Sequence, residues 1–126
     1  RLRGTREFRL TSVLGSPVSD GPFTASLGES VRLRWSPAQA RYEVRVRFSW
    51  RRRGRRPAGV LVCRPRQPGR FTLPTAWLRR LPVRHPGLDG SLEVRVTQRI
   101  QARIPGLDRA TLVVSQSDAV PLTLVR

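Results

Sequence analysis

Strict alternation of apolar and polar residues in three segments constrains the fold of this chain more than any other feature. The segments are Ser30–Ser36, Tyr42–Trp50 and Ser91–Thr97. Every second residue in them is apolar, which is the period of a β-strand with one buried and one solvated face. The residues predicted to face inward are Val31, Leu33, Trp35, Tyr42, Val44, Val46, Phe48, Trp50, Leu92, Val94 and Val96.

Shorter segments extend this pattern to the rest of the chain. Further strands are predicted at Glu7–Leu14, Phe23–Leu27, Ala58–Cys63, Arg109–Ser115 and Ala119–Val125. Glycine, proline and aspartate separate them, as turns require. The sequence therefore predicts an all-β sandwich of about seven to nine short antiparallel strands.

One short helical turn is predicted at Pro74–Leu81. Pro74 suits the first position of a helix, and Pro82 cannot continue one. We expect Trp77 in this turn to plug one end of the core. The length of 126 residues is typical of one domain. We therefore predict a single domain over residues 1–126, in which residues 1–29 supply N-terminal strands, one of them an edge or exchanged strand.

Four features follow one another in the order found in a known group of domains. They are the strand that ends at Trp35, the long strand Tyr42–Trp50, the lone Cys63 and the segment Gly69–Pro82, which reads GRFTLPTAWLRRLP. In this order they resemble Ig-like or fibronectin type III-like domains of secreted bacterial proteins and lipoproteins. The resemblance implies an Ig-like sandwich and an extracellular, cell-surface or periplasmic location.

The sequence offers no pattern for catalysis or metal binding. His85 is the single histidine and Cys63 the single cysteine, so the chain cannot assemble a Cys/His metal site. A Cys63 nucleophile with His85 as its base is the one enzymatic alternative, but the apolar run before Cys63 favours a buried, inert thiol. Arg64, Arg66 and Arg70 stand where the similar domains often carry acidic residues, so calcium binding is not carried over. We expect no enzyme activity, no metal and no cofactor.

The charge of the chain is the remaining functional signal. It has 25 Lys+Arg residues, all of them arginine, against 8 Asp+Glu residues, for a formal net charge of +17. A GC-rich genome accounts for arginine in place of lysine, and any one outward arginine is ordinarily a solvated side chain. The shortage of acids is different, because a compact domain of this charge repels itself unless counterions or a partner offset the charge.

Two sets of arginines are predicted to bind an acidic partner. Guanidinium groups bind carboxylate, phosphate and sulfate in bidentate fashion. The first set faces outward from the alternating strands and would form one positive surface if those strands share a sheet: Arg32, Arg34, Arg45, Arg47 and Arg95. The second set is a run in the turn after Trp50: Arg51, Arg52, Arg53, Arg55 and Arg56.

These features favour a structural or interaction module of an exported bacterial protein. It would dock on an acidic protein or self-assemble, using the arginines and the strand edges at Glu7–Leu14 and Ala119–Val125. The alternative is a protein that binds nucleic acid or acidic polysaccharide without sequence specificity. Base stacking is disfavoured, because the aromatic residues of the alternating strands fall on the apolar face. No apolar run is long enough to span a membrane.

Overall fold

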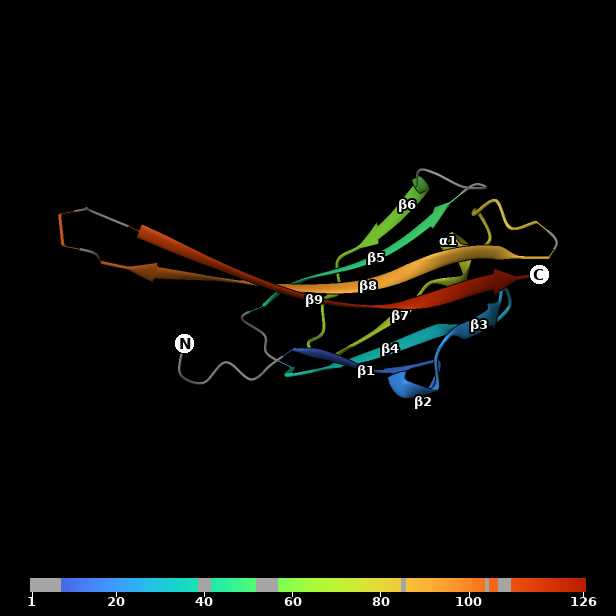
Figure 1. The fold of residues 1–126 in the computed structure, drawn as a ribbon, viewed down its shortest axis with the longest axis horizontal. Helices are drawn as coiled ribbons and strands as arrows, with labels where there is room; N and C mark the ends of the chain where they lie inside the picture. Colours follow the sequence, from blue (N-terminus) through green and yellow to red (C-terminus); the bar gives the residue numbers. More distant parts are fainter. Residues whose placement is uncertain (1–7, 39–41, 52–56, 85, 104, 107–109) are drawn as a thin grey trace.

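The computed structural model describes residues 8–38, 42–51, 57–84, 86–103, 105–106 and 110–126. These residues form an all-β fold in which two sheets face each other, as the alternation predicts (Figure 1). The elements in chain order are β1 (Arg9–Val13), β2 (Ser16–Pro17), the 3-10 turn η1 (Val18–Asp20), β3 (Phe23–Ser26), β4 (Val31–Ser36), β5 (Glu43–Arg51), β6 (Pro57–Cys63), β7 (Arg70–Leu73), α1 (Thr75–Leu78), β8 (Leu88–Ala102) and β9 (Ala110–Val125).

The strands divide into a four-stranded sheet, in the order β2-β1-β4-β7, and a five-stranded sheet, in the order β3-β9-β8-β5-β6. Neighbouring strands are antiparallel except β3 and β9, which run parallel. β8 and β9 are also longer than predicted, at 15 and 16 residues. The all-β prediction is confirmed, and the parallel pair and the long strands are its two departures.

The core lies between the sheets and contains the residues that the alternation places inward. Trp35 on β4 is 4% exposed and Phe48 on β5 is 0% exposed. Tyr42 and Trp50, at the two ends of the predicted Tyr42–Trp50 strand, are only half-buried against the same core. The remaining predicted core residues are buried: Val31, Leu33, Val44, Val46, Leu92, Val94 and Val96.

Strand β9 is continuous where two strands were predicted. Arg109–Ser115 and Ala119–Val125 were expected to be separate, but β9 pairs with β8 along its whole length. Pro121 does not break the ladder, because β3 pairs with β9 only from Leu122 onward. On that side no neighbouring strand requires the N–H that Pro121 lacks.

The polar residues that interrupt the apolar pattern of β9 join the two sheets. The Gln116 side chain accepts a hydrogen bond from the Phe8 N–H at 3.1 Å, and the Asp118 side chain accepts one from the Leu10 N–H at 2.9 Å. Backbone N–H groups on the β1 side of the four-stranded sheet are thereby satisfied by β9 of the five-stranded sheet. The interruption marks an inter-sheet contact and not the end of a strand.

The predicted pairing edges at Glu7–Leu14 and Ala119–Val125 are wrong at Ser12–Val13 and at Leu122–Val125, where another strand pairs with them. β1 lies between β2 and β4, and β9 lies between β3 and β8. Within the described residues, β2 pairs with β1 at Ser12 and Val13, and β3 pairs with β9 from Leu122 to Val125, so each strand is covered over part of its length. Among the described residues the sheet edges are β2, β3, β6 and β7.

The predicted helical turn is present as α1, but a different residue contacts the core. Leu78 is 0% exposed, whereas Trp77 is 49% exposed and does not plug the sandwich. A helix of one turn presents only one of its side chains squarely to the core, and here that side chain is Leu78. The Arg80 guanidinium carbon lies 5.0 Å from the centre of the Trp77 ring, which is the geometry of a cation–π contact.

The β8–β9 hairpin extends beyond the two sheets (Figure 1). β5 pairs with β8 only as far as Glu43 opposite Thr97, whereas β8 and β9 pair on to Ala102 opposite Ala110. The distal part of the hairpin is therefore a two-stranded arm. Leu112 and Val113 on this arm are 46% and 50% exposed.

Candidate partner-binding surface

The outer face of the four-stranded sheet is basic. Arg32 and Arg34 alternate with buried residues on β4 and are exposed. Arg70 on β7 is also exposed and stands opposite Arg34 in the strand register. Strands β1, β2, β4 and β7 contain no aspartate or glutamate. Like charges directly opposite each other repel, so this face favours the approach of an anion.

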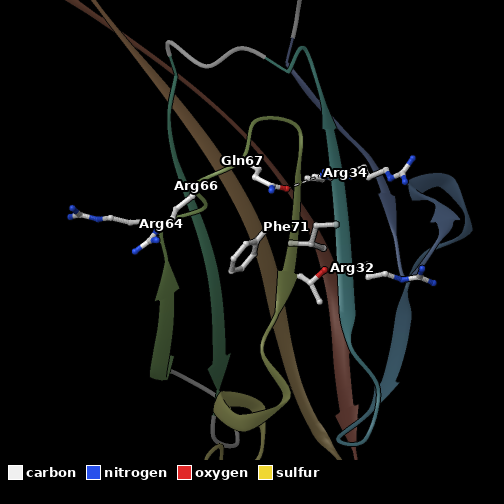
Figure 2. A pocket seen from close by; sticks show the side chains of 9 residues that line it. Arg32, Arg34, Arg64, Arg66, Gln67 and Phe71 are labelled. Carbon is white, nitrogen blue, oxygen red and sulfur yellow. Dashed lines mark hydrogen bonds between the residues drawn. The ribbon is translucent and has the colours of Figure 1, made fainter.

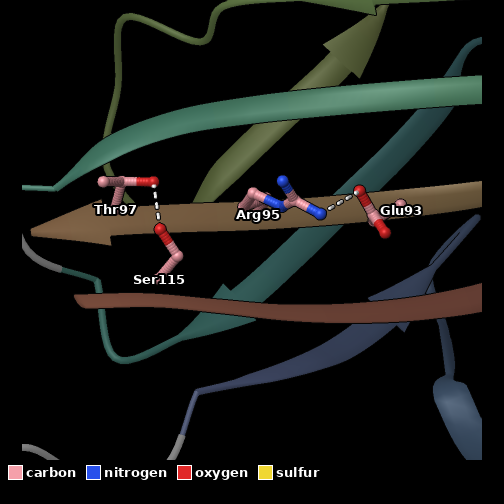
Figure 3. Close-up of polar contacts among 4 residues, drawn as sticks. All are labelled: Glu93, Arg95, Thr97 and Ser115. Carbon is pink, nitrogen blue, oxygen red and sulfur yellow. Dashed lines mark hydrogen bonds and ion pairs between the residues drawn. The ribbon is translucent and has the colours of Figure 1, made fainter. Parts of the chain in front are cut away.

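The outer face of the five-stranded sheet carries both signs of charge. The Arg95 guanidinium lies 3.7 Å from the Glu93 carboxylate (Figure 3), and Arg99 lies 3.5 Å from Glu43. Arg47 stands opposite Glu93 in the register of β5 and β8. Exposed ion pairs of this kind add little stability. These ion pairs do reduce the positive potential of this face. We therefore expect it to attract anions less strongly than the outer face of the four-stranded sheet does.

The predicted outward arginines do not form one surface. Arg32 and Arg34 belong to the four-stranded sheet, whereas Arg45, Arg47 and Arg95 belong to the five-stranded sheet on the other side of the core. The expectation of one shared face is wrong, because alternation shows which residues point outward but not which sheet a strand joins.

The predicted run after Trp50 is only partly within the described residues. Arg51 ends β5. The other members lie outside the residues that the structure describes: Arg52, Arg53, Arg55 and Arg56. Their contribution to the surface stays a prediction.

A groove of about 650 Å³ runs along β7, between the edge strands of the two sheets (Figure 2). β4, β7 and the connection from β6 to β7 line it. Arginine is the only charged residue type in the lining, and the apolar part is supplied by Leu33 and Phe71. The lining arginines are Arg32, Arg34, Arg64, Arg66 and Arg70.

Apolar and basic groups occupy different parts of this groove. Phe71 is half-buried, stands opposite the buried Leu33 and points toward the β6 side, whereas Arg32 and Arg34 point to the other side of β4 (Figure 2). Gln67 accepts a hydrogen bond from Nε of Arg70 at 3.0 Å. The groove thus offers an aromatic floor and guanidinium groups at its rim.

Sequence reasoning did not include the rim arginines among the site residues. Arg64, Arg66 and Arg70 fall in the segment RPRQPGR between two strands, where they read as loop residues. A usable signal was present, since basic residues replace the acidic residues often found there in the similar domains. Phe71 gave no such signal, because an aromatic residue on a strand is ordinarily part of the core.

The candidate metal-binding and nucleophilic groups can be compared with the described residues. No cluster of three or more His, Cys, Asp or Glu side chains that could hold a metal ion occurs there. Burial raises the pKa of the half-buried Cys63 thiol, which lowers the fraction of the nucleophilic thiolate. His85 lies outside the described residues, so the alternative of a Cys63 nucleophile with His85 as its base is not tested.

Comparison with protein-family models, with curated proteins and with solved structures gives no significant match to this chain. In the part of the chain that the structure describes, no helix has the length and apolar character to cross a membrane.

Proposed function

We propose that this chain is a non-catalytic interaction module with an Ig-like sandwich fold, which docks on an acidic protein through its arginine-rich surface. The observation that carries the proposal is the basic face of the four-stranded sheet, whose strands contain no carboxylate, and its continuation into the groove beside β7. An exported bacterial origin is part of the proposal and is supported only by the resemblance of the Trp35 to Pro82 motifs.

The mixed character of the groove favours a protein partner over a polyanion. Half-buried Phe71 gives the groove an apolar surface on the β6 side of β7, and apolar side chains of a protein would bury this surface. The phosphate or sulfate groups of a polyanion are polar and would not bury this apolar surface. Trp35 and Phe48 are buried and cannot stack with bases, and the exposed ring of Trp77 lies on α1 and does not line the groove.

Two matched triple variants test the proposal. R32S/R34S/R70S removes charge from the four-stranded sheet, and R45S/R47S/R95S removes the same charge from the five-stranded sheet. Each protein is applied to immobilised polyglutamate and eluted with a sodium chloride gradient. We expect R32S/R34S/R70S to elute at clearly lower salt than R45S/R47S/R95S, because the strands that carry its three arginines contain no Asp or Glu, whereas Arg95 already pairs with Glu93. Equal elution of the two variants would show retention by bulk charge and would overturn the proposal.

The same comparison on heparin and on duplex DNA tests the polyanion alternative. On DNA each phosphate contact contributes a slope of about −0.9 in the log–log dependence of affinity on salt. Stronger retention of the unmodified chain on DNA or heparin than on polyglutamate at every salt concentration would replace the protein partner with a polyanion. Stronger retention on polyglutamate supports the proposal.

A further inference from the structure

The two lateral openings of the sandwich differ in how they are closed. At the β1–β9 opening, Asp118 and Gln116 accept hydrogen bonds from the N–H groups of Leu10 and Phe8. The chain crosses between the sheets at both openings, through η1 from β2 to β3 at this one and through the connection from β6 to β7 at the other, so the side-chain hydrogen bonds to Leu10 and Phe8 are what distinguishes this opening. At the opposite opening, β6 ends the five-stranded sheet, β7 ends the four-stranded sheet, and the groove lies beside them (Figure 2).

Strand β6 begins with Pro57, beside a register shift of the β5–β6 ladder at Trp50/Arg51, but its remaining length from Gly59 to Cys63 lacks the devices that usually protect a sheet edge. Natural edge strands carry charges, prolines or bulges that prevent pairing with another chain. From Gly59 to Cys63 the sequence of β6 is GVLVC, with no charged residue and no proline. Val60 and Val62 are 44% and 50% exposed on its outer side, while Leu61 and Cys63 pack against the core. In this segment the edge is apolar on both faces and rich in residues that favour strands.

We infer that β6 receives an extended segment of the acidic partner as an additional strand of the five-stranded sheet. This inference rests on the proposed function, because it specifies how that partner binds. Main-chain hydrogen bonds to an exposed edge would supply affinity, and alternate side chains would supply specificity. Every second side chain of the partner segment would lie beside Leu61 and Cys63, on the side of the groove that contains Phe71. The side chains between them would lie beside Val60 and Val62.

The arginines at the end of β6 define which segment fits. Arg64 follows the last residue of β6 directly, and Arg66 and Arg70 line the same groove. A partner segment that fits therefore has apolar, β-branched residues in its centre, next to β6. It has carboxylates at the end that lies near Arg64 and Arg66. Pairing of β6 with β6 of a second copy would instead bring together two chains that each carry a net charge of +17. Charge complementarity selects the acidic segment.

A synthetic peptide of alternating valine and threonine, about seven residues long to match a typical strand and ending in glutamates, tests the inference. Two further peptides of the same sequence are N-methylated at every second residue, one in each phase. N-methylation removes the N–H groups on one edge of the peptide and leaves its charge unchanged. We expect one methylated peptide to bind at least about tenfold more weakly than the parent, a loss of about 1.4 kcal/mol, because one set of N–H groups pairs with β6.

Amide hydrogen exchange locates the bound peptide. We expect the parent peptide to slow exchange at Gly59–Cys63, where free edge N–H groups become paired. The R64S/R66S variant should bind the peptide several-fold more weakly, whereas R79S/R84S, which loses the same charge at exposed positions outside the groove, should bind it as the unmodified chain does.

Three outcomes would overturn strand addition. They are equal binding of all three peptides, protection outside β6, or protection of Gly59–Cys63 by self-association without peptide. The first two leave the proposed function standing, because the acidic peptide still binds. The proposed function is tested separately by the elution of R32S/R34S/R70S and R45S/R47S/R95S from polyglutamate. Neither of these variants alters β6, Arg64 or Arg66.

Discussion

Gly90 on β8 occupies a position where even one added carbon would disturb the core. A Cβ there would lie 2.5 Å from Cζ of Phe48 and 2.5 Å from the carbonyl oxygen of Ser49. The first is a fully buried ring and the second is backbone of the paired strand β5, so neither can move away easily. We expect Gly90→Ala to lower the free energy of unfolding by about 1–3 kcal/mol.

Urea unfolding followed by tryptophan fluorescence measures this loss. Gly28→Ala is the matched control, because no atom outside its chain neighbours lies within 4 Å of its added Cβ. Gly28 also has no positive φ, so alanine fits its backbone. A stability loss for Gly90→Ala no larger than for Gly28→Ala would contradict the tight packing of β5 against β8.

Asp118 has a structural role that its exposed neighbours on β9 do not share. Its side chain accepts hydrogen bonds from the N–H of Leu10 at 2.9 Å and of Ala119 at 3.0 Å. Asp118→Ala would leave the part-buried Leu10 N–H without this acceptor, at a cost of about 1–3 kcal/mol in the free energy of unfolding. Ser117→Ala on the exposed face of β9 should change stability little. Equal losses in urea unfolding would contradict the inter-sheet role of Asp118.

The β8–β9 hairpin combines two regions of different stability in one pair of strands. Its proximal part lies within the five-stranded sheet, whereas among the described residues Gln98–Ala102 pair with Ala110–Val114 and with no other strand. A two-stranded ribbon is marginally stable in water. We therefore expect amide hydrogens of the distal ladder to exchange much faster than those of Leu92–Val96. Equal protection along β8 would show that another contact covers the arm, and dilution would reveal whether that contact is a second copy.

The sequence predicts which side chains of a strand face the core better than it predicts which strands pair with one another. Alternation on β4 and β5 correctly predicts Val31, Leu33 and Phe48 as core, because burial of one face acts on every second residue. It does not determine that β4 and β5 belong to different sheets, since sheet membership depends on contacts between distant segments. For the same reason the sequence predicts a break between Ser115 and Ala119, although Gln116 and Asp118 in this interval accept hydrogen bonds from Phe8 and Leu10 across the sandwich.

The groove illustrates the same limit at the scale of the whole molecule. Its lining comes from β4, β7 and the connection before β7, and the long strand β5 and strand β6 lie between β4 and that connection in the chain. No local pattern joins Arg34 to Arg70, which become register partners only when β7 pairs with β4. The excess of arginine could be recognised from composition. Only the pairing of strands shows that Arg32, Arg34 and Arg70 share a sheet whose strands contain no carboxylate, whereas the glutamates of β5 and β8 lie in the other sheet.

Self-repulsion should make the stability of the whole molecule depend on salt. With a net charge of +17, the folded chain concentrates positive charge that the expanded unfolded chain disperses. The Debye length falls from about 30 Å at 0.01 M salt to about 8 Å at 0.15 M, so added salt should relieve this repulsion and raise the Tm. R32S/R34S/R70S should show a smaller rise than R79S/R84S/R103S, which loses the same charge from exposed positions outside the four-stranded sheet. Calorimetric scans of both variants at increasing sodium chloride concentration measure how far the Tm of each one rises. A Tm that falls with salt, or equal responses of the two variants, would show that the arginines of the four-stranded sheet do not repel one another in the folded state.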